Sequence, residues 1–457
     1  MAAPMPGYYE MTKKGRSWRN RRRKSQKKEE GVRLASLMSR DDNIELMRWL
    51  RKNGFRDTHL VLTDFPDTGR GVMATRNLKE GDCIVSLPEN LLITTTTVVN
   101  SRLGQYIKNW KPHLTPKQVL SLFLIAEKFR GKDSFWYPYL QTLPTSYTTP
   151  SYFSTAEVDA LPPAVREATL QHRKVLQNSY KSLRTSLHTL EPLFPDWKTA
   201  FTFKSYRWAW ATVYTRSVYK KGPAWEFLDP SDRDVYALAP FLDMLNHSPS
   251  VQTDTDFNVK SKCYEVKTET ACRKYSQVFI NYDPYDNARL LMEYGFVLPH
   301  NPHSVVKFTV DDLVACLSVD DRNGLSNKNL LQKKMELLSQ ESLTQNLSCS
   351  TEGLSWRLQT ALQILCMDHD SICNWRIVLG QTPHDPALRS TVQLVAQRLI
   401  SRRLEQHYSL TQVAEKVLNP GSSLMSIFIL MLLKEDLNIL EQSLQNMKSN
   451  TDGDLEQ

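Results

Sequence analysis

The stretch "FLDMLNHSP" (241–249) places polar side chains with useful chemistry directly after an apolar segment. Asp243 carries a carboxylate, Asn246 an amide and His247 an imidazole ring. Two interpretations are open from these nine residues. Asn, His and Ser before Pro249 can form an ordinary turn, in which side chains bond their own backbone. In the second interpretation, a binding site begins where the apolar segment ends.

A second stretch, "TGRGVMATR" (68–76), enters an expected strand between two glycines. Gly69 and Gly71 allow main chain to approach a ligand closely, because glycine has no side chain. The pattern is not the GxGxxG motif of dinucleotide-binding folds, since the third glycine and the following helix are missing. From the local sequence alone, the two glycines can equally serve only to shape a turn.

A third stretch, "VFINYDPYDNARLLMEYGFVLPHNPH" (278–303), carries Tyr282 and Tyr294. Val278, Ile280 and Tyr282 alternate along the chain, so we expect them on one face of a strand. A tyrosine at the end of an apolar face suits the wall of a pocket. The alternative is a half-buried strand tyrosine whose hydroxyl meets water.

The elements that must position these stretches follow from turn, cap and apolar patterns. Residues 41–55 are expected to form a helix. The segment 59–94 alternates short strands with turns, and 79–82 predicts a hairpin connection between "GVMATRNL" and "CIVSLP". Strand character returns over 255–282, and a short helix is expected at 287–295.

Helices are predicted between these strands. At 114–131, Thr115 is the expected N-cap, Gln118 completes a capping box and Gly131 ends the helix. The region 165–222 continues as helix, with 206–219 rich in aromatic residues.

After about residue 305 the sequence is mainly helical. Apolar stripes at helical spacing predict the core of a helical domain, and they comprise Leu358, Ala361, Leu362, Leu365 and Cys366 in one segment and Leu388, Val392, Val395 and Leu399 in another. The longest apolar run, 424–433, is shorter than the roughly 20 residues of a bilayer span, and we interpret it as a buried core helix.

The bulk composition narrows the class of protein. The 457 residues are 41% hydrophobic, which is enough for two or three domains with cores. Seven scattered cysteines, without a CxxC pair or zinc-finger spacing, predict a reducing compartment and no structural metal. A polar, basic N-terminus predicts no secretory signal.

The positive charge is concentrated in one segment. Residues 13–28 contain ten Lys or Arg and no acid, and subtracting them from the net charge of +9 leaves −1 for the rest. Such a block repels itself and is expected to be disordered. It predicts contact with an importin or a nucleic acid, or else a solubilising tail without a partner.

Together and in this order, the three chemical stretches resemble a SET domain, and more narrowly the branch typified by the plant Rubisco large-subunit lysine methyltransferase. The resemblance covers roughly residues 50–440, and "NHS" with "INY…N…LL…YGF" is its most specific part. It implies an α+β fold: a SET domain of small twisted β-sheets with a pseudoknot-type crossing and a helical insert, then an all-α Rubisco-substrate-binding-like domain. The expected divisions are a disordered basic tail (1–40), the SET domain (41–303, core about 58–283, helical insert 100–235), the helical substrate-binding domain (304–447) and a disordered tail (448–457).

The resemblance also implies a cofactor, S-adenosyl-L-methionine. In this family, main chain of the glycine stretch contacts the cofactor, and the Asn-His pair meets its adenine and amino-acid ends. His247 is therefore expected to hydrogen-bond rather than to act as a general base. Arg216 either contacts the cofactor carboxylate or lies on a helix surface. The residues expected around the cofactor are Thr68, Gly69, Arg70, Gly71, Arg216, Asn246, His247 and Tyr282.

Tyr282 and Tyr294 are the expected catalytic residues. A free lysine has a pKa of about 10.4, and an apolar channel beside a sulfonium disfavours its charged form. A tyrosine hydroxyl and carbonyl oxygens can then align the amine with the methyl group. Tyr294 also shapes the amine pocket, where a hydroxyl favours fewer methyl additions. Asp243 and Phe296 are expected to line the channel with Tyr294, although Asp243 can be a turn cap and Phe296 plain core.

One departure from the branch concerns the lysine pocket. Thr215-Arg216-Ser217-Val218 stands where the Rubisco enzyme has a Ser-Arg-Ala-Phe-like stretch, so the shape of the pocket is open. A cysteine-rich zinc site after the SET domain is missing, as is usual in this branch, whose channel is closed by the helical domain.

The resemblance implies a protein-lysine N-methyltransferase that acts on a histone H3 or H4 tail or on a non-histone protein. One relative methylates a histidine in actin, so a histidine target is an alternative, as is an inactive SET-fold scaffold that binds proteins. We expect a monomer, no membrane contact, and a location in the nucleus and cytosol.

Overall fold

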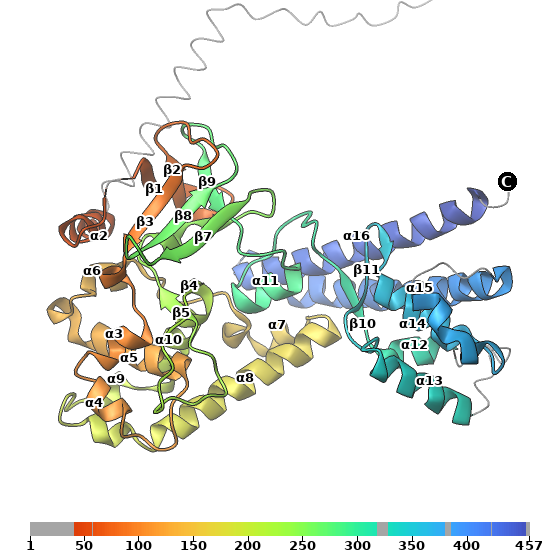
Figure 1. Cartoon of the computed structure of the whole chain (residues 1–457), viewed down its shortest axis with the longest axis horizontal. Coiled ribbons are helices and arrows are strands. Elements are labelled where there is room, and N and C mark those ends of the chain that lie inside the picture. Colours follow the sequence, from red (N-terminus) through yellow and green to blue (C-terminus); the bar gives the residue numbers. More distant parts are fainter. Residues whose placement is uncertain (1–40, 57, 318–327, 380–384, 422, 454–457) are drawn as a thin grey trace, which may run out of the picture.

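The structure is a computed structural model that describes residues 41–56, 58–317, 328–379, 385–421 and 423–453. The basic segment 13–28, with its predicted importin or nucleic-acid contact, lies outside these residues. Figure 1 shows the small sheets above a group of helices at one end of the molecule, and the C-terminal helices at the other end. Within the described ranges, no helix is both long and apolar enough to cross a bilayer.

The first sheet brings distant parts of the chain together. Its strand order is β1-β2-β9-β6, and the last pair is parallel whereas the others are antiparallel. Two strands from the start of the SET region therefore pair with two from its end, which is the crossing expected of this fold. The strands are β1 (Leu60–Phe65), β2 (Gly69–Ala74), β6 (Asn246–His247) and β9 (Gln277–Ile280).

The second sheet corrects the predicted hairpin at 79–82. Its order is β3-β8-β7, with β3 (Cys83–Pro88), β7 (Thr253–Asn258) and β8 (Cys263–Thr268). The residues 79–82 do form a turn, but β2 and β3 do not pair. The free edge of β2 is taken by β9, with Val72 opposite Val278, and β3 pairs with β8. Local turn residues predict where the chain bends but not which strand becomes the partner.

The helical insert lies below the sheets in Figure 1. Thr115 and Gln118 form the predicted capping box of α5, and Gly131 ends this helix with a φ of +56°. The aromatic helix ends at Arg216, earlier than predicted, because Ser217–Tyr219 pair with Tyr236–Leu238 as β4 and β5. The helices are α2 (Asp41–Lys52) before the sheets, then α3 (Thr95–Val99), α4 (Gly104–Ile107), α5 (Pro116–Arg130), α6 (Tyr137–Thr142), α7 (Thr155–Asp159), α8 (Pro163–Arg184), α9 (Trp197–Ala200), α10 (Phe203–Arg216) and, after β9, α11 (Asn287–Glu293).

The C-terminal part is helical, as predicted, with one small sheet that the sequence did not indicate. That sheet has the order β10-β11-β12, with β10 (Val306–Phe308), β11 (Leu347–Ser350) and β12 (Gly353–Leu354). Leu358, Leu362, Val395 and Leu399 are buried, so both predicted stripes face a core. The helices are α12 (Val310–Leu317), α13 (Lys328–Gln340), α14 (Trp356–Cys366), α15 (Pro386–Val417) and α16 (Leu424–Gly453).

Helix α16 continues to Gly453, so the expectation of a disordered tail is wrong for residues 448–453. No proline or glycine interrupts the helical sequence before Gly453, and such residues are the strongest signals that end a helix. The predicted division at 304 remains a prediction.

A third group of buried residues joins the insert to the C-terminal helices. Phe153 and Val158 from the insert, Leu291 from α11, and Ile429 and Leu433 from α16 belong to one apolar cluster. Polar contacts reinforce the junction, because a Glu157 carboxylate oxygen accepts hydrogen bonds from the hydroxyls of Ser423 at 2.6 Å and Ser426 at 3.1 Å. The two parts of the chain are thus joined by a buried apolar interface.

Candidate active site

Asn246 links β6 to the glycine stretch. Its side-chain Nδ2 donates a hydrogen bond to the main-chain oxygen of Arg70 on β2 at 3.0 Å. The turn interpretation is therefore wrong for Asn246, whose partner lies 176 residues away rather than in its own backbone. It holds for Ser248, whose hydroxyl oxygen accepts a hydrogen bond from the main-chain N–H of Ser250 at 3.3 Å.

The two glycines have different roles. Gly69 has a φ of +67° and open space around it, so it shapes the β1–β2 turn. A Cβ on Gly71 would lie 2.6 Å from Nε2 of Gln277 and 2.9 Å from Nδ2 of Asn246. Gly71 thus lets two side-chain amides come close to the main chain. Thr68 is connected to the same group, because its hydroxyl donates to Oε1 of Gln277 at 2.8 Å.

His247 is buried and neutral at pH 7. Burial lowers the pKa of its imidazole to about 4. Nδ1 accepts a hydrogen bond from the main-chain N–H of Tyr282 at 3.0 Å, so the proton of the neutral ring belongs on Nε2. That Nε2 is buried and has no partner among the described residues. His247 therefore offers a free donor, which agrees with the predicted hydrogen-bonding role rather than with a general base.

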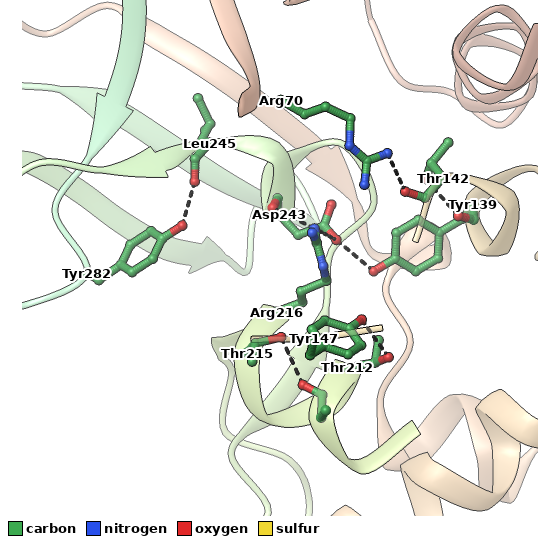
Figure 2. Close-up of polar contacts among 11 residues, drawn as sticks. Arg70, Tyr139, Thr142, Tyr147, Thr212, Thr215, Arg216, Asp243, Leu245 and Tyr282 are labelled. Carbon is green, nitrogen blue, oxygen red and sulfur yellow. Dashed lines mark hydrogen bonds and ion pairs between the residues drawn. The ribbon is translucent and has the colours of Figure 1, made fainter. Parts of the chain in front are cut away.

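Tyr282 lies just beyond the end of β9 and is half-buried. It donates a hydrogen bond to the main-chain oxygen of Leu245 at 2.7 Å (Figure 2). Burial raises the pKa of the hydroxyl to about 12, so it stays protonated at neutral pH. The hydroxyl therefore has a main-chain partner, whereas the alternative from the sequence left it to water.

Five aromatic rings from two of the three predicted stretches form one cluster. The Tyr282 ring centroid lies 4.8 Å from that of Tyr294 and 5.1 Å from that of His247. Phe296 lies 6.3 Å from Tyr294, and Tyr285 stacks on the other side of Tyr294 at 6.1 Å. Tyr294, Phe296 and Tyr282 are thus brought together as predicted, and Phe296 contacts the site rather than remote core.

Asp243 and Arg216 form a buried ion pair. Nη1 of Arg216 lies 3.1 Å from Oδ2 of Asp243 and also donates to the main-chain oxygen of Asp243 at 3.1 Å. The Asp243 carboxylate is completely buried, and only 18% of the Arg216 side chain is exposed. The alternatives of a turn cap for Asp243 and of a surface arginine for Arg216 are therefore both wrong.

Helix α6 of the insert makes one contact with this pair and one with Arg70 on β2, as Figure 2 shows. The hydroxyl of Tyr139 on α6 donates to Oδ2 of Asp243 at 2.9 Å, and the guanidinium of Arg70 donates to the main-chain oxygen of Thr142 at 2.9 Å. Sequence reasoning singled out Arg70 for its main chain only, and it missed Tyr139. The motif "SFWYPYLQTLP" (134–144) contains Tyr139, but nothing in the sequence pairs that tyrosine with a residue 104 positions later.

A cavity of about 490 Å³ lies beside Tyr282. Its wall carries many tyrosines together with balancing charges, and the glycine stretch is not part of it. Tyr282 therefore lines the cavity on one side and contacts His247 on the other. The polar wall residues include Lys117, Tyr214, Arg216, Tyr219, Tyr236, Asp243, Tyr264, Tyr282, Tyr285, Arg289, Glu293 and Tyr294.

Several wall residues escaped sequence reasoning. Tyr285 stands within the quoted stretch at 278–303 and could have been chosen from its position between the two selected tyrosines. Tyr219 and Tyr236 come from the insert strands, for which no local signal exists. A larger hollow of about 680 Å³ lies between α2 and β1, and of the three motif stretches it touches only Thr75, which is not among the predicted site residues.

Comparison with known proteins agrees with this architecture. The model of the SET domain family matches residues 69–283. The chain is 40% identical to SET domain-containing protein 4 of Mus musculus over 435 residues, which cover 94% of this chain and 97% of the relative. It is 27% identical to the actin-histidine N-methyltransferase of Xenopus tropicalis over 451 residues, covering 93% and 73%.

Solved structures of Rubisco LSMT share the fold. One is bound to sinefungin and monomethyllysine and has a TM-score of 0.61 at 19% identity. Another is bound to AdoMet and has a TM-score of 0.58 at 19% identity. Each alignment covers 90% of this chain and 92% of the other chain.

Proposed function

Since this chain belongs to the SET domain family and is an S-adenosyl-L-methionine-dependent methyltransferase by fold and relationship, we propose that it methylates the ε-amine of a lysine in a protein. The observation that carries the proposal is the place of Tyr282. This tyrosine lies between the Asn-His motif and a tyrosine-lined cavity, where a methyl donor and an amine would meet.

The described residues fit the cofactor. Gly71 lets the side-chain amides of Gln277 and Asn246 lie against the main chain, and the amide of Gln277 and the imidazole of His247 carry buried nitrogen donors without protein partners among the described residues. Asn246 orders the main chain at Arg70 by its hydrogen bond. When bound there, S-adenosyl-L-methionine supplies a methyl group activated by the sulfonium charge.

The protein contributes by aligning the amine with the methyl group and by keeping water out of the site. Tyr282 keeps its proton, since the pKa of its hydroxyl is about 12, and it therefore orients neighbouring groups rather than removing a proton. The Leu245 oxygen fixes the direction of that hydroxyl. The rings of Tyr282, Tyr294 and Phe296 exclude water, which favours the neutral form of the substrate amine. Holding this amine in line with the methyl group accounts for much of the rate of methyl transfer.

A lysine target is supported by the aromatic rings that lie close together around Tyr282. A flexible alkyl chain can pass along closely spaced rings, whereas a flat imidazole needs a wider slot. The tyrosine faces can also accept a cationic amine on its way in. The solved Rubisco LSMT that binds monomethyllysine has the same fold. The likeness to an actin-histidine N-methyltransferase along 93% of the chain makes histidine the second candidate.

The decisive experiment is transfer of labelled methyl from S-adenosyl-L-methionine to a proteome extract by the intact chain and by Tyr282→Phe. We expect labelled proteins with the intact chain, strong loss in the variant, and methyl-lysine in the labelled peptides by mass spectrometry. Methyl-histidine would replace the lysine proposal by the second candidate. Cofactor binding by calorimetry without any transfer would favour a non-catalytic scaffold.

The substrate class and location rest on the basic segment at 13–28. We propose that this segment gives access to the nucleus, so histone H3 or H4 tails are substrates beside non-histone proteins of the cytosol. The basic segment would act by contacting an importin or a nucleic acid. Imaging of the chain without residues 1–30 tests this, and unchanged nuclear signal would remove the proposal.

A further inference from the structure

The Asp243 carboxylate depends on two donors from different elements. Its Oδ2 accepts from Arg216 at the end of α10 and from the hydroxyl of Tyr139 on α6. Its Oδ1 is buried and has no partner among the described residues. A buried charge with few partners is costly when one of them is removed. The Tyr139 hydroxyl, completely buried itself, therefore matters more than a surface contact would.

The chain around Asp243 needs such anchoring because its backbone is strained. Phe241, which directly precedes the 3-10 turn Leu242–Met244, has a φ of +72°, a region that bulky residues rarely adopt. A strained conformation persists only when its surroundings hold it. Here the guanidinium of Arg216 holds both the side chain and the main-chain oxygen of Asp243.

The anchored turn leads directly to the catalytic tyrosine. Two residues after Asp243, the main-chain oxygen of Leu245 accepts the hydrogen bond that orients the Tyr282 hydroxyl. Figure 2 shows the four residues in order, from Tyr139 through Asp243 to Leu245 and Tyr282. A shift of the Leu242–Met244 turn would move the Leu245 oxygen, and the Tyr282 hydroxyl would then lose its orientation.

We propose that Tyr139 of the helical insert is a positioning residue for methyl transfer, which acts on Tyr282 through the Asp243 carboxylate and the turn that follows it. This inference rests on the proposed function. It gives the helical insert a role in methyl transfer in addition to the packing of its helices.

The test compares Tyr139→Phe with Tyr206→Phe. Tyr206 on α10 is a matched control, since it is also completely buried, and its hydroxyl bonds the hydroxyl of Ser179 on α8 at 2.7 Å. Each variant loses one buried hydroxyl. Because misplacement of reacting groups can reduce rates on the order of 100-fold, we expect Tyr139→Phe to lower kcat by about tenfold or more. The KM for S-adenosyl-L-methionine should change little, and Tyr206→Phe should keep the wild-type kcat.

A pH profile separates positioning from general loss of structure. The groups that face the Asp243 carboxyl are Arg216, Tyr139 and, at longer range, Arg70, Tyr147 and Tyr282. Burial raises the pKa of Asp243, and Arg216 and the Tyr139 hydroxyl oppose this rise. Without the hydroxyl the carboxylate protonates at a higher pH, so the acidic limb of kcat should move upward in Tyr139→Phe and stay in place in Tyr206→Phe.

A double-mutant cycle with Asp243→Asn completes the test. If Tyr139 acts through Asp243, Tyr139→Phe should lower kcat much less in the Asp243→Asn variant than in the wild-type chain. Equal losses in the two tyrosine variants, an unmoved acidic limb, or additive effects with Asp243→Asn would overturn the inference while leaving the methyltransferase proposal intact. Absence of transfer by the wild-type chain would instead count against the proposed function.

Discussion

The side-chain amide of Asn246 and the main-chain oxygen of Arg70 are joined by a hydrogen bond of 3.0 Å, which holds the end of β6 against β2. Two motifs that lie far apart in the sequence thereby become one surface. This surface is the part of the molecule to which we assign the cofactor.

Replacing Asn246 by Asp should therefore weaken cofactor binding. The new carboxylate oxygen would face the Arg70 carbonyl without a proton to share, and such an unpaired buried group costs about 1–3 kcal/mol. We expect the Kd for S-adenosyl-L-methionine, measured by calorimetry, to rise by about tenfold or more. Ser248→Ala removes an exposed hydroxyl nearby and should leave the Kd unchanged. Equal Kd values for wild type and Asn246→Asp would contradict this assignment.

The two glycines predict opposite outcomes for the same substitution. Gly71→Ala places a methyl group 2.6 Å from the Gln277 amide, which must move, so cofactor affinity should fall. Gly69→Ala meets no neighbour but must keep a φ of +67°, so it should lose about 1–2 kcal/mol of stability with little effect on affinity. Calorimetry and urea unfolding of both variants check the pair, and similar affinities would argue against a role for Gly71 in the site.

Tyr294 should control the number of methyl groups added. Its ring lies 4.8 Å from that of Tyr282, so its hydroxyl can hold water or the amine and restrict rotation. We expect Tyr294→Phe to shift the products, resolved by mass spectrometry, toward higher methylation. Tyr264→Phe removes another hydroxyl from the same cavity and serves as the control. An identical product distribution in all three proteins would exclude the assigned role.

His247 should make stability depend on pH in a defined window. The pKa of its imidazole is about 4 in the fold, below the ordinary value of 6.5, so the unfolded chain binds the additional proton between these values. The folded state should lose stability as pH falls from 6.5 toward 4, with a slope that approaches about 1.4 kcal/mol per pH unit.

The variant His247→Gln isolates this contribution. A glutamine oxygen can still accept from the Tyr282 N–H but does not titrate. The difference in unfolding free energy between wild type and variant, measured in urea at several pH values, should shrink on acidification across that window. A difference that is constant with pH would show that the imidazole is not held neutral by burial.

Breaking the buried Arg216–Asp243 ion pair should reduce the free energy of unfolding far more than breaking an exposed pair. Arg216→Gln leaves the buried Asp243 carboxylate without its counter-charge, and such a change typically costs about 3–5 kcal/mol. Arg166→Gln breaks the Arg166–Asp159 pair, whose side chains are 49% and 53% exposed, and should cost at most about 1 kcal/mol. Equal losses of unfolding free energy in the two variants, measured with a denaturant, would refute this prediction.

Features set by neighbouring residues could be predicted from the sequence. The capping box of α5 depends on Thr115 and Gln118, three positions apart, and it was predicted correctly. The buried stripe of α15 follows from spacing along one helix in the same way. The cofactor-side residues were identified by family resemblance, and the structure brings Asn246 and Gly71 together.

Features that depend on distant pairing were not predicted from local patterns. The partner of β3 is β8, some 180 positions later in the chain, and no turn signal at 79–82 could reveal it. The contact between Tyr139 and Asp243 is of the same kind. Buried polar pairs of this sort need two side chains to meet across elements, and a single sequence carries no record of that meeting.

The shared cluster around α16 has a consequence for how the molecule comes apart. Leu291 and Val158 are covered by Ile429 and Leu433, and Glu157 is satisfied by Ser423 and Ser426. Cutting the chain before α16 would expose apolar side chains and leave a carboxylate without its donors. The catalytic half and the helical half should therefore melt as one cooperative unit, in a single calorimetric transition, rather than as two independent bodies.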